Sequence, residues 1–359
     1  MQYKKHTRRI CMRKYLLPKE GKFYKANLHC HSTISDGSLT PEEIKQVYQQ
    51  HGYSIVAYTD HDVLISHSDL TDDNFLALNG FEIGINDINA PSYVEGQTVH
   101  ICLISLSQDN LIHPVWHRTK YLFANAVNYR NKVQYDENKP DFEKEYTPEC
   151  VNKIISEGRN NGFFVTYNHP VWSMENYKTY SLYHGMHAIE ICNYSSLVGG
   201  YDECVPHIYD DMLREGEKIF CIATDDNHNI QPLNSRRSDS FGAFTMIKAE
   251  RLDYPSIANA LINGHFYASQ GPEIYELYYE NERVYLTCSN ADCISMNVGV
   301  RHAVAVFDES GSGITKAVFD VDTPIVNYVR FSVTDKYGKK AYTNAYFYKD
   351  FVDANETES

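Results

Sequence analysis

Residues 27–62 read NLHCHSTISDGSLTPEEIKQVYQQHGYSIVAYTDHD and decide the expected fold. The middle of this stretch carries the signals of a helix, with Thr40 as N-cap, Pro41 at the first helical position, Glu43 completing a capping box and Gly52 at the end. The apolar run YSIVAYT follows at once and is typical of a buried strand. A strand, a helix and a second strand in this order form the repeating unit of a parallel sheet covered by helices.

The same alternation continues outward from this unit. Further apolar runs are FLALNGFEIGI, VHICLISL, GFFVTYNHP, HAIEICNY, KIFCIATDD and FGAFTMIKA, and helical patterns lie between several of them, at residues 147–161, 202–216 and 254–263. This number of units favours a closed or nearly closed α/β barrel over an open sheet, and we expect it to occupy residues 1–272. Residues 107–146, rich in tyrosine and asparagine, are interpreted as an insertion, either a wall over a site or a surface excursion.

The pattern changes after the Gly271-Pro272 pair. Residues 273–349 show short apolar and alternating runs separated by turns such as DKYGKK, without a clear helix. We therefore expect a small antiparallel β-sandwich-like domain over residues 273–359, ending in a short polar tail.

Composition narrows the class of protein. The chain has 359 residues, a formal net charge of -14 and nine cysteines without a CxxC pair. The acidic balance argues against a long nucleic-acid footprint. The scattered cysteines argue against a disulfide framework and favour a cytoplasmic location. We expect no membrane segment and no secretory signal behind the basic N-terminal arm. The sequence does not indicate an oligomeric state.

Histidines and acids recur at the edges of the predicted strands. In a barrel such edges converge on one mouth, and the alternation of a strand sends the two histidines of NLHCH to one side and Cys30 to the other. Nine candidate metal ligands are found in this way, almost all at such edges and Asp36 in the loop STISDGS: His29, His31, Asp36, His61, Glu82, His100, His169, Asp226 and His228. Mixed imidazole and carboxylate ligands suit zinc, manganese or iron, and nine of them exceed the needs of one ion. A single histidine at a strand end is more often structural, so only the ordered set supports a metal site.

These motifs together resemble the PHP family, named after polymerase and histidinol phosphatase domains. The resemblance rests on NLHCHSTISDG, TDHD, FEI, VHI, NHP and TDDNH and extends over about residues 23–272. It implies a distorted (β/α)7 barrel with a trinuclear metal site, and we expect two to three divalent ions to be bound. Carried onto this chain, the first ion would be held by His29, His31, Glu82 and Asp226. The second would be held by Glu82, His100 and His169, with Glu82 bridging, and the third by Asp36, His61 and His228.

We therefore expect a metal-dependent phosphoesterase that hydrolyses a small phosphomonoester, such as a nucleotide, by attack of a metal-bridging hydroxide. The catalytic residues would be Asp226, Glu82, Arg236 and Arg237, the two arginines binding phosphate unless they are solvated loop charges. Arg118 and Arg130 are weaker phosphate-binding candidates. One alternative is an exonuclease acting on short oligonucleotides, with base stacking on tyrosines such as Tyr177, Tyr180 and Tyr183. Another is a noncatalytic metal-binding module.

Four further acids flank these motifs. Asp60 and Asp62 lie on either side of His61, and we expect at least one of them to orient imidazoles. Asp225 stands where a small residue is common in the family, and it either hydrogen-bonds a ligand or is a neutral substitution. Glu190, at the end of the run IEICN, is expected to give structural support.

Overall fold

The computed structural model describes residues 13–92, 94–321 and 327–351, which divide into two compact units. The larger unit comprises Glu20–Gly271 and Ala341–Asn344. The smaller unit comprises the described parts of Met1–Lys19, Pro272–Lys340 and Ala345–Ser359. Most of the basic N-terminal arm and the predicted polar tail lie outside the described residues.

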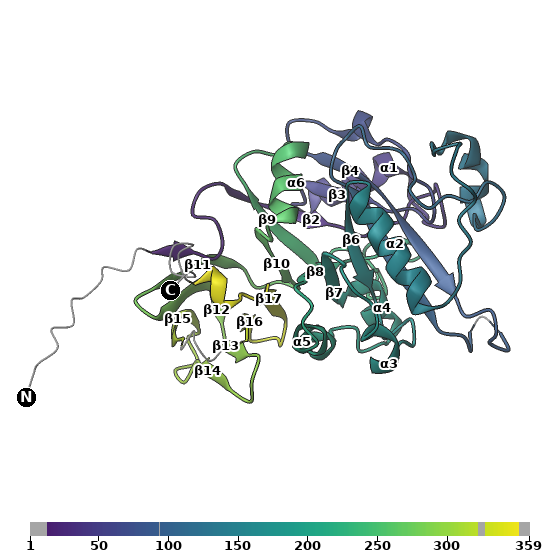
Figure 1. Cartoon of the computed structure of the whole chain (residues 1–359). Helices are drawn as coiled ribbons and strands as arrows, with labels where there is room; N and C mark the ends of the chain where they lie inside the picture. The colour runs from purple at the N-terminus through teal and green to yellow at the C-terminus, as the bar shows by residue number, and fades with distance from the viewer. Residues whose placement is uncertain (1–12, 93, 322–326, 352–359) are drawn as a thin grey trace, which may run out of the picture. The chain divides into compact units, whose positions relative to one another are not determined.

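One large mixed sheet forms the framework of the larger unit (Figure 1). Its strands follow the spatial order β17-β10-β9-β2-β3-β4-β5-β6-β7-β8. Their bounds are β2 (Lys22–Asn27), β3 (Ile55–Tyr58), β4 (Leu76–Asn86), β5 (Thr98–Ser105), β6 (Phe163–Asn168), β7 (Ala188–Asn193), β8 (Phe220–Thr224), β9 (Phe244–Ala249), β10 (Phe266–Ser269) and β17 (Lys340–Thr343).

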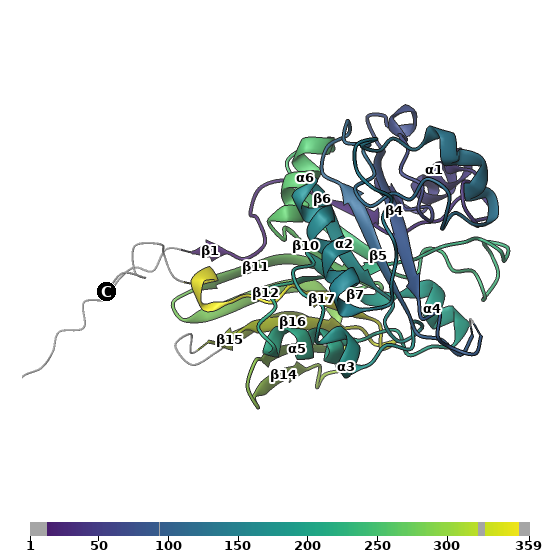
Figure 2. The same ribbon diagram turned by 45° about the vertical axis from the view of Figure 1, so that its right-hand side comes forward.

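The sheet is less parallel than the sequence predicts. Strands β2, β3 and β4 run parallel, as do β6, β7 and β8. However, β5 is antiparallel to both β4 and β6, and β9 is antiparallel to β2. The long strands β4 and β5 lie side by side in Figure 2, and a loop without a crossover helix joins them, which an antiparallel pair permits.

A closed (β/α)7 barrel is not confirmed, because the hydrogen-bonded ladder is open between β8 and β9. Side chains satisfy the backbone at this gap. Thr245 Oγ1 accepts from the Ala223 N–H at 3.2 Å and donates to the Ala223 carbonyl at 2.9 Å. Asn344 Oδ1 accepts from the Cys221 N–H at 2.9 Å. The edge of β8 is therefore covered by hydrogen-bonding side chains.

Few helices accompany this sheet. They are α1 (Pro41–Gln50), α2 (Pro148–Asn160), α3 (Tyr177–Tyr180), α4 (Tyr194–Gly199), α5 (Pro206–Arg214) and α6 (Tyr254–Ile262), with short 3-10 turns at η1 (Ser68–Leu70) and η2 (Ala124–Lys132). The predicted capping box of α1 is confirmed, since Thr40 and Glu43 exchange hydrogen bonds between side chain and backbone. The helical stretches predicted near residues 147, 202 and 254 correspond to α2, α5 and α6.

The core lies inside the curled sheet. Apolar side chains from β2 through β10 pack into one cluster that excludes water. This core supports the strands at whose ends the candidate histidines and acids lie. The cluster includes Ala26, Ile55, Leu78, Ile104, Phe164, Ala188, Ile222, Ile247 and Phe266. On the other side of β3, helix α1 buries Ile44 and Tyr48 with Cys30, so Cys30 packs away from the neighbouring histidines as predicted.

The smaller unit consists of antiparallel strands. One sheet has the order β1 (Lys14–Tyr15), β11 (Ile274–Glu280), β12 (Arg283–Ala291) and β15 (Ile314–Asp320). The strands β14 (Ala303–Phe307), β13 (Cys293–Val298) and β16 (Val329–Thr334) pair in that order, and a turn η4 (Tyr348–Asp350) follows. Phe319 of β15 contacts Phe331 of β16 with ring centroids 5.6 Å apart, so apolar side chains join the two strand groups as in a sandwich.

Candidate metal centre

The nine residues singled out in the sequence come together at one edge of the large sheet. His29 and His31 follow β2, His61 follows β3, His169 follows β6, and Asp226 and His228 follow β8. Glu82 lies within β4 rather than at its end, and His100 lies near the start of β5. Because β5 runs antiparallel to its neighbours, its beginning lies beside their ends, and His100 pairs with Asn168.

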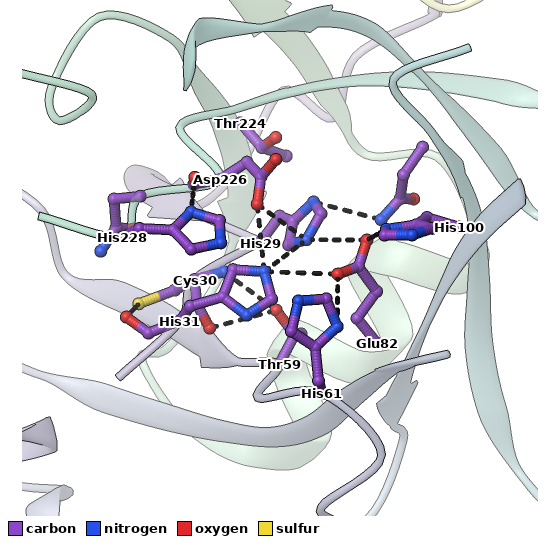
Figure 3. A network of polar contacts seen from close by, with 12 residues as sticks. His29, Cys30, His31, Thr59, His61, Glu82, His100, Thr224, Asp226 and His228 are labelled. Carbon is purple, nitrogen blue, oxygen red and sulfur yellow. Dashed lines mark hydrogen bonds and ion pairs between the residues drawn. The ribbon is translucent and has the colours of Figure 1, made fainter. Parts of the chain in front are cut away.

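Four side chains form the middle of the cluster (Figure 3). Asp226 Oδ1 lies 3.1 Å from both His29 Nε2 and His31 Nε2. Glu82 approaches the same two nitrogens at 3.2 Å and 3.3 Å. Ligand atoms about 2.0–2.1 Å from a tetrahedral ion lie about 3.3 Å apart, so these spacings match a common metal.

Glu82 extends toward two further groups. Its Oε1 lies 2.9 Å from His100 Nδ1 and 3.2 Å from His169 Nε2, while its Oε2 lies 3.2 Å from His61 Nδ1. Both oxygens of one buried carboxylate thus face imidazoles on different sides. This is the arrangement needed for a carboxylate that bridges two ions.

The remaining residues form a looser group on the other side of His31. Asp36 Oδ2 lies 3.5 Å from His61 Nε2 and 3.6 Å from His228 Nε2, and His31 Nδ1 lies 3.6 Å from Asp36 Oδ1. The group with metal-binding geometry therefore contains His31 in addition to the three residues implied by the family resemblance. One imidazole then faces two groups through its two nitrogens.

Two buried atoms support the fit to a metal. His31 Nδ1 and Asp226 Oδ1 have no hydrogen-bond partner of acceptable geometry within the described residues. Buried polar atoms are ordinarily satisfied, and two such atoms that face a set of imidazoles and carboxylates are suited to binding a cation. Together with the donor types and spacings, they show that these residues fit divalent metals.

The charges of the cluster lead to the same conclusion. Burial opposes a charge on His31, but its contacts with Asp226 and Glu82 outweigh burial and raise its pKa to about 10. Despite burial, the neighbouring imidazoles lower the pKa of Asp226 and of Glu82 below their ordinary values. Two ionised carboxylates therefore lie among buried imidazoles. Protonated His31 and His169 balance their charge in the metal-free protein, and bound metals would replace those protons.

Glu190 orients the central imidazole from behind. Its Oε1 lies 2.7 Å from His29 Nδ1 and accepts from Thr224 Oγ1 at 2.6 Å. Its Oε2 accepts from the His169 N–H and from Asn193 Nδ2, both at 3.0 Å. A carboxylate on the far nitrogen fixes the tautomer and leaves His29 Nε2 free to face Asp226 and Glu82.

Three other carboxylates shape the loops that carry the cluster. Asp60 accepts hydrogen bonds from both Ser32 and Ser35 and so holds the turn before Asp36, rather than an imidazole. Asp225 accepts from Tyr48 Oη and from three backbone N–H groups of residues 241–243, and contacts no ligand side chain in the described residues. Glu203 accepts from the N–H groups of residues 171 and 172, which follow His169.

The backbone is strained at the same place. His169 has a φ of 26°, Asp226 a φ of 52° and Asp62 a φ of 56°. Non-glycine residues rarely adopt this left-handed region, and such strain persists where the surroundings hold it and where function requires it.

A cavity of about 810 Å³ opens beside the cluster. Its walls include the aromatic side chains of Tyr121, Phe123, Trp172 and Tyr201. The Phe123 ring lies 4.8 Å from the His61 ring, and Trp172 lies 5.3 Å from His100. Among the described residues that line the cavity, Lys144 is the one lysine or arginine, and its Nζ lies 2.7 Å from Asp62 Oδ1.

The predicted phosphate-binding arginines do not reach this cavity. Arg236 and Arg237 are exposed on the loop after His228 and are not among its lining residues. Arg118 pairs with Asp141 at 2.7 Å, and Arg130 donates to the backbone carbonyl of Arg118 at 2.7 Å. The positively charged side chain that lines the cavity is instead Lys144, near the end of the predicted insertion.

The tyrosines considered for base stacking have other partners. Tyr183 donates to the buried carboxylate of Glu175 at 2.6 Å, and Tyr180 donates to Asp211 at 3.0 Å. Tyr177 donates to Glu215. None of the three lines the cavity within the described part of the chain.

Lys144, Glu203 and Trp172 have roles around the site that sequence reasoning missed. Lys144 and Glu203 belong to no motif, and their partners Asp62 and residues 171–172 are far away in the sequence. The one usable signal was the position of Trp172, three residues after His169 in the motif NHPVW.

Solved structures similar to this chain include the following three. One is a two-domain protein from Bacteroides vulgatus that contains a predicted PHP-like metal-dependent phosphoesterase. It is 17% identical, has a TM-score of 0.43, and the match covers 93% of this chain and 98% of that one. Its name contains the family that the sequence motifs resemble.

A candidate metal-dependent phosphoesterase from Bifidobacterium adolescentis is 15% identical with a TM-score of 0.38, covering 59% of this chain and 91% of that one. An amidohydrolase from Chromobacterium violaceum, with bound sulfate and no metal, is 15% identical with a TM-score of 0.37, covering 56% and 87%. No protein-family model and no curated protein matches the sequence.

Proposed function

We propose that this chain is a metal-dependent phosphoesterase of the PHP family that hydrolyses a small phosphomonoester. The observation that carries the proposal is the convergence of six histidines and three carboxylates from separate loops and strands beside a cavity. We also propose that the larger unit is a distorted (β/α)7 barrel, opened between β8 and β9, that it is the catalytic domain, and that the β-rich unit is an extension of it.

We propose that these donors bind two to three divalent ions of zinc, manganese or iron. His29, His31, Glu82 and Asp226 would hold the first ion. Glu82, His100 and His169 would hold the second. A third would lie among Asp36, His61 and His228, with His31 Nδ1 directed toward it. Imidazole and carboxylate donors suit these metals better than calcium or magnesium.

Bound metals would supply a nucleophilic water at neutral pH and Lewis-acid stabilisation of phosphoryl oxygens. The protein's own residues provide the geometry for this chemistry. Glu82 and Asp226 remain ionised, and Glu190 keeps His29 in the tautomer that presents Nε2. Lys144 adds one positive charge at the cavity, although Asp62 partly neutralises it.

The size of the cavity favours a small substrate. A volume of about 810 Å³ suits a mononucleotide-sized molecule. Aromatic side chains on its wall offer apolar contact to the part of the substrate beyond the phosphate. An oligonucleotide would need a longer stacking surface, and the tyrosines first considered for that role are bonded elsewhere.

The test is phosphate release by the metal-loaded protein from a panel of small phosphomonoesters and a short 5′-phosphorylated oligonucleotide. The proposal expects turnover of at least one small ester and its loss in Asp226→Ala. Asp320→Ala, at an exposed position of the smaller unit, is the matched control and should retain turnover. If the protein releases mononucleotides from the oligonucleotide and hydrolyses no small ester, it is a nuclease and not a phosphatase. If the metal-loaded protein turns over nothing in the panel, both activities are ruled out.

A further inference from the structure

Two cysteines face each other beside the metal centre. Cys192 is the next-to-last residue of β7, and Cys204 forms an isolated antiparallel bridge with it. The Asn193 N–H donates to the Glu203 carbonyl at 3.1 Å, and the Val205 N–H donates to the Ile191 carbonyl at 2.8 Å. The two cysteines are therefore a non-hydrogen-bonded antiparallel pair, a type of pair in which the Cα atoms are typically about 4.5 Å apart.

That separation falls within the range of about 4.4–6.8 Å found across disulfides. The thiols are already directed at each other, since Cys204 Sγ lies 2.7 Å from Cys192 Sγ. A covalent sulfur bond, at about 2.05 Å, requires only a small further approach. Backbone and side chains are thus both placed for a cross-strand disulfide.

Access to the pair is one-sided. Cys192 is buried, while Cys204 is partly exposed beside the exposed residues Tyr201 and Asp202. Burial also raises the pKa of the Cys192 thiol, so Cys204 is the thiol that a reagent from solution meets first.

We propose that Cys192 and Cys204 are a redox-active dithiol that low-molecular-weight disulfides oxidise to an intramolecular disulfide. The Cys204 thiolate attacks one sulfur of the small disulfide, forms a mixed disulfide and releases one thiolate. The Cys192 thiolate then attacks Cys204 Sγ and releases the second thiolate. The two protons of the cysteine thiols pass to solvent, and the small disulfide gains the two electrons that the protein loses.

The bond would close a short loop that carries part of the metal centre and its cavity. Within this loop, Asn193 Nδ2 donates to Asp226 Oδ2 at 3.1 Å, and Glu203 holds the backbone after His169. Ser195, Ser196, Gly199 and Tyr201 of the same loop line the cavity. Oxidation would therefore fix one wall of the cavity, whatever reaction takes place there.

The experiment equilibrates the full chain with mixtures of oxidised and reduced glutathione, followed by alkylation, proteolysis and mass spectrometry. The chain has nine cysteines, so oxidation should lower the number of alkylated thiols from nine to seven and yield one cross-linked peptide joining residues 192 and 204. Amide hydrogen exchange of residues 193–203 should slow in the oxidised protein. The cross-link should be absent from Cys204→Ser and retained in Cys150→Ser, because Cys150 is the other partly exposed thiol of the described residues.

Two results would overturn the proposal. One is accumulation of the mixed disulfide at Cys204 without the cross-link, and the other is full alkylation of both thiols at the most oxidising ratio. If amide hydrogen exchange of residues 193–203 is unchanged in the cross-linked protein, oxidation does not fix this wall of the cavity. All of these readouts are independent of phosphate release, so they remain informative if the proposed reaction is wrong.

Discussion

Glu190 Oε1 lies 2.7 Å from His29 Nδ1, on the side of the imidazole opposite to Asp226 and Glu82. The contact joins a carboxylate of β7 to the loop after β2, and the same carboxylate also accepts from the His169 N–H. One buried side chain therefore positions two of the residues proposed to bind metal.

Replacing Glu190 by Gln should weaken metal binding by about 10- to 100-fold, because the amide is a poorer partner for the His29 N–H and can donate where only acceptors are needed. Metal titration by calorimetry measures the change. Glu175→Gln is the matched control, since Glu175 is a buried carboxylate bonded to tyrosines instead of to the cluster. Equal affinity in wild type and Glu190→Gln would contradict this role.

Gly84→Ala should disturb the group formed by Glu82, His100 and His169. A Cβ at Gly84 would lie 2.9 Å from His100 Nε2, which is too close unless the imidazole moves. We expect loss of one metal from the stoichiometry measured by elemental analysis. Gly199→Ala lines the same cavity, but its Cβ would meet only the Tyr201 ring at 3.6 Å, so it should bind metal normally. Identical stoichiometry in the two variants would show that His100 does not hold metal.

Lys144→Met should destabilise the larger unit by about 3 kcal/mol, because it leaves the Asp62 carboxylate buried without its partner. The double variant Lys144→Met/Asp62→Asn should recover part of this loss, since it removes the unpaired charge as well. Urea unfolding of the wild type, the two single variants and the double variant completes the cycle. Additive losses would mean that the ion pair contributes nothing measurable.

Glu175 should make stability depend on pH. Burial raises its pKa to about 7, although three tyrosine hydroxyls partly offset that effect. The carboxyl of Glu175 therefore holds its proton more tightly in the folded state than in the unfolded state. Its contribution to the free energy of unfolding falls as pH rises from about 4.3 to about 7. As pH rises from about 4.3 to about 7, the melting temperature of the wild type should therefore fall relative to that of Glu175→Gln. A constant difference would place the folded pKa near its ordinary value.

The clustering of the nine candidate metal ligands could be predicted because each motif that carries them is local. A strand end, an HxH pair and a turn before Asp36 are all visible in a few consecutive residues, and the edge of a sheet collects them. His100 came together with the others for a reason the sequence did not reveal. It lies near the start of β5, and only the antiparallel direction of β5 brings that start to the edge where the neighbouring strands end.

Contacts between distant segments could not be predicted. The pairing of Lys144 with Asp62 joins residues 82 positions apart, and Glu203 reaches residues 171 and 172 from the loop after β7. Nearness in sequence to Asp226 favours Arg236 and Arg237 as phosphate ligands, but both side chains are exposed to solvent on their loop. The gap between β8 and β9 depends on the side chains of Thr245 and Asn344, which carry no recognisable pattern.

No helix in residues 13–92, 94–321 and 327–351 combines the length and apolar character needed to cross a membrane. The two compact units do not follow the predicted boundary at residue 272 alone, because Ala341–Asn344 belongs to the larger unit and the described residues before Glu20 belong to the smaller one. The segment Lys14–Tyr15 pairs with β11 of the smaller unit, a long-range contact that the basic N-terminal sequence does not indicate.

The number of metal ions bound per chain tests the central claim most directly. The apoprotein is dialysed to equilibrium against manganese or zinc, and bound metal is measured by elemental analysis alongside Asp226→Ala and the exposed control Asp320→Ala. The account predicts two to three ions in wild type and control, and at least one fewer in Asp226→Ala. Fewer than one ion in wild type, or the same number in Asp226→Ala, would contradict it.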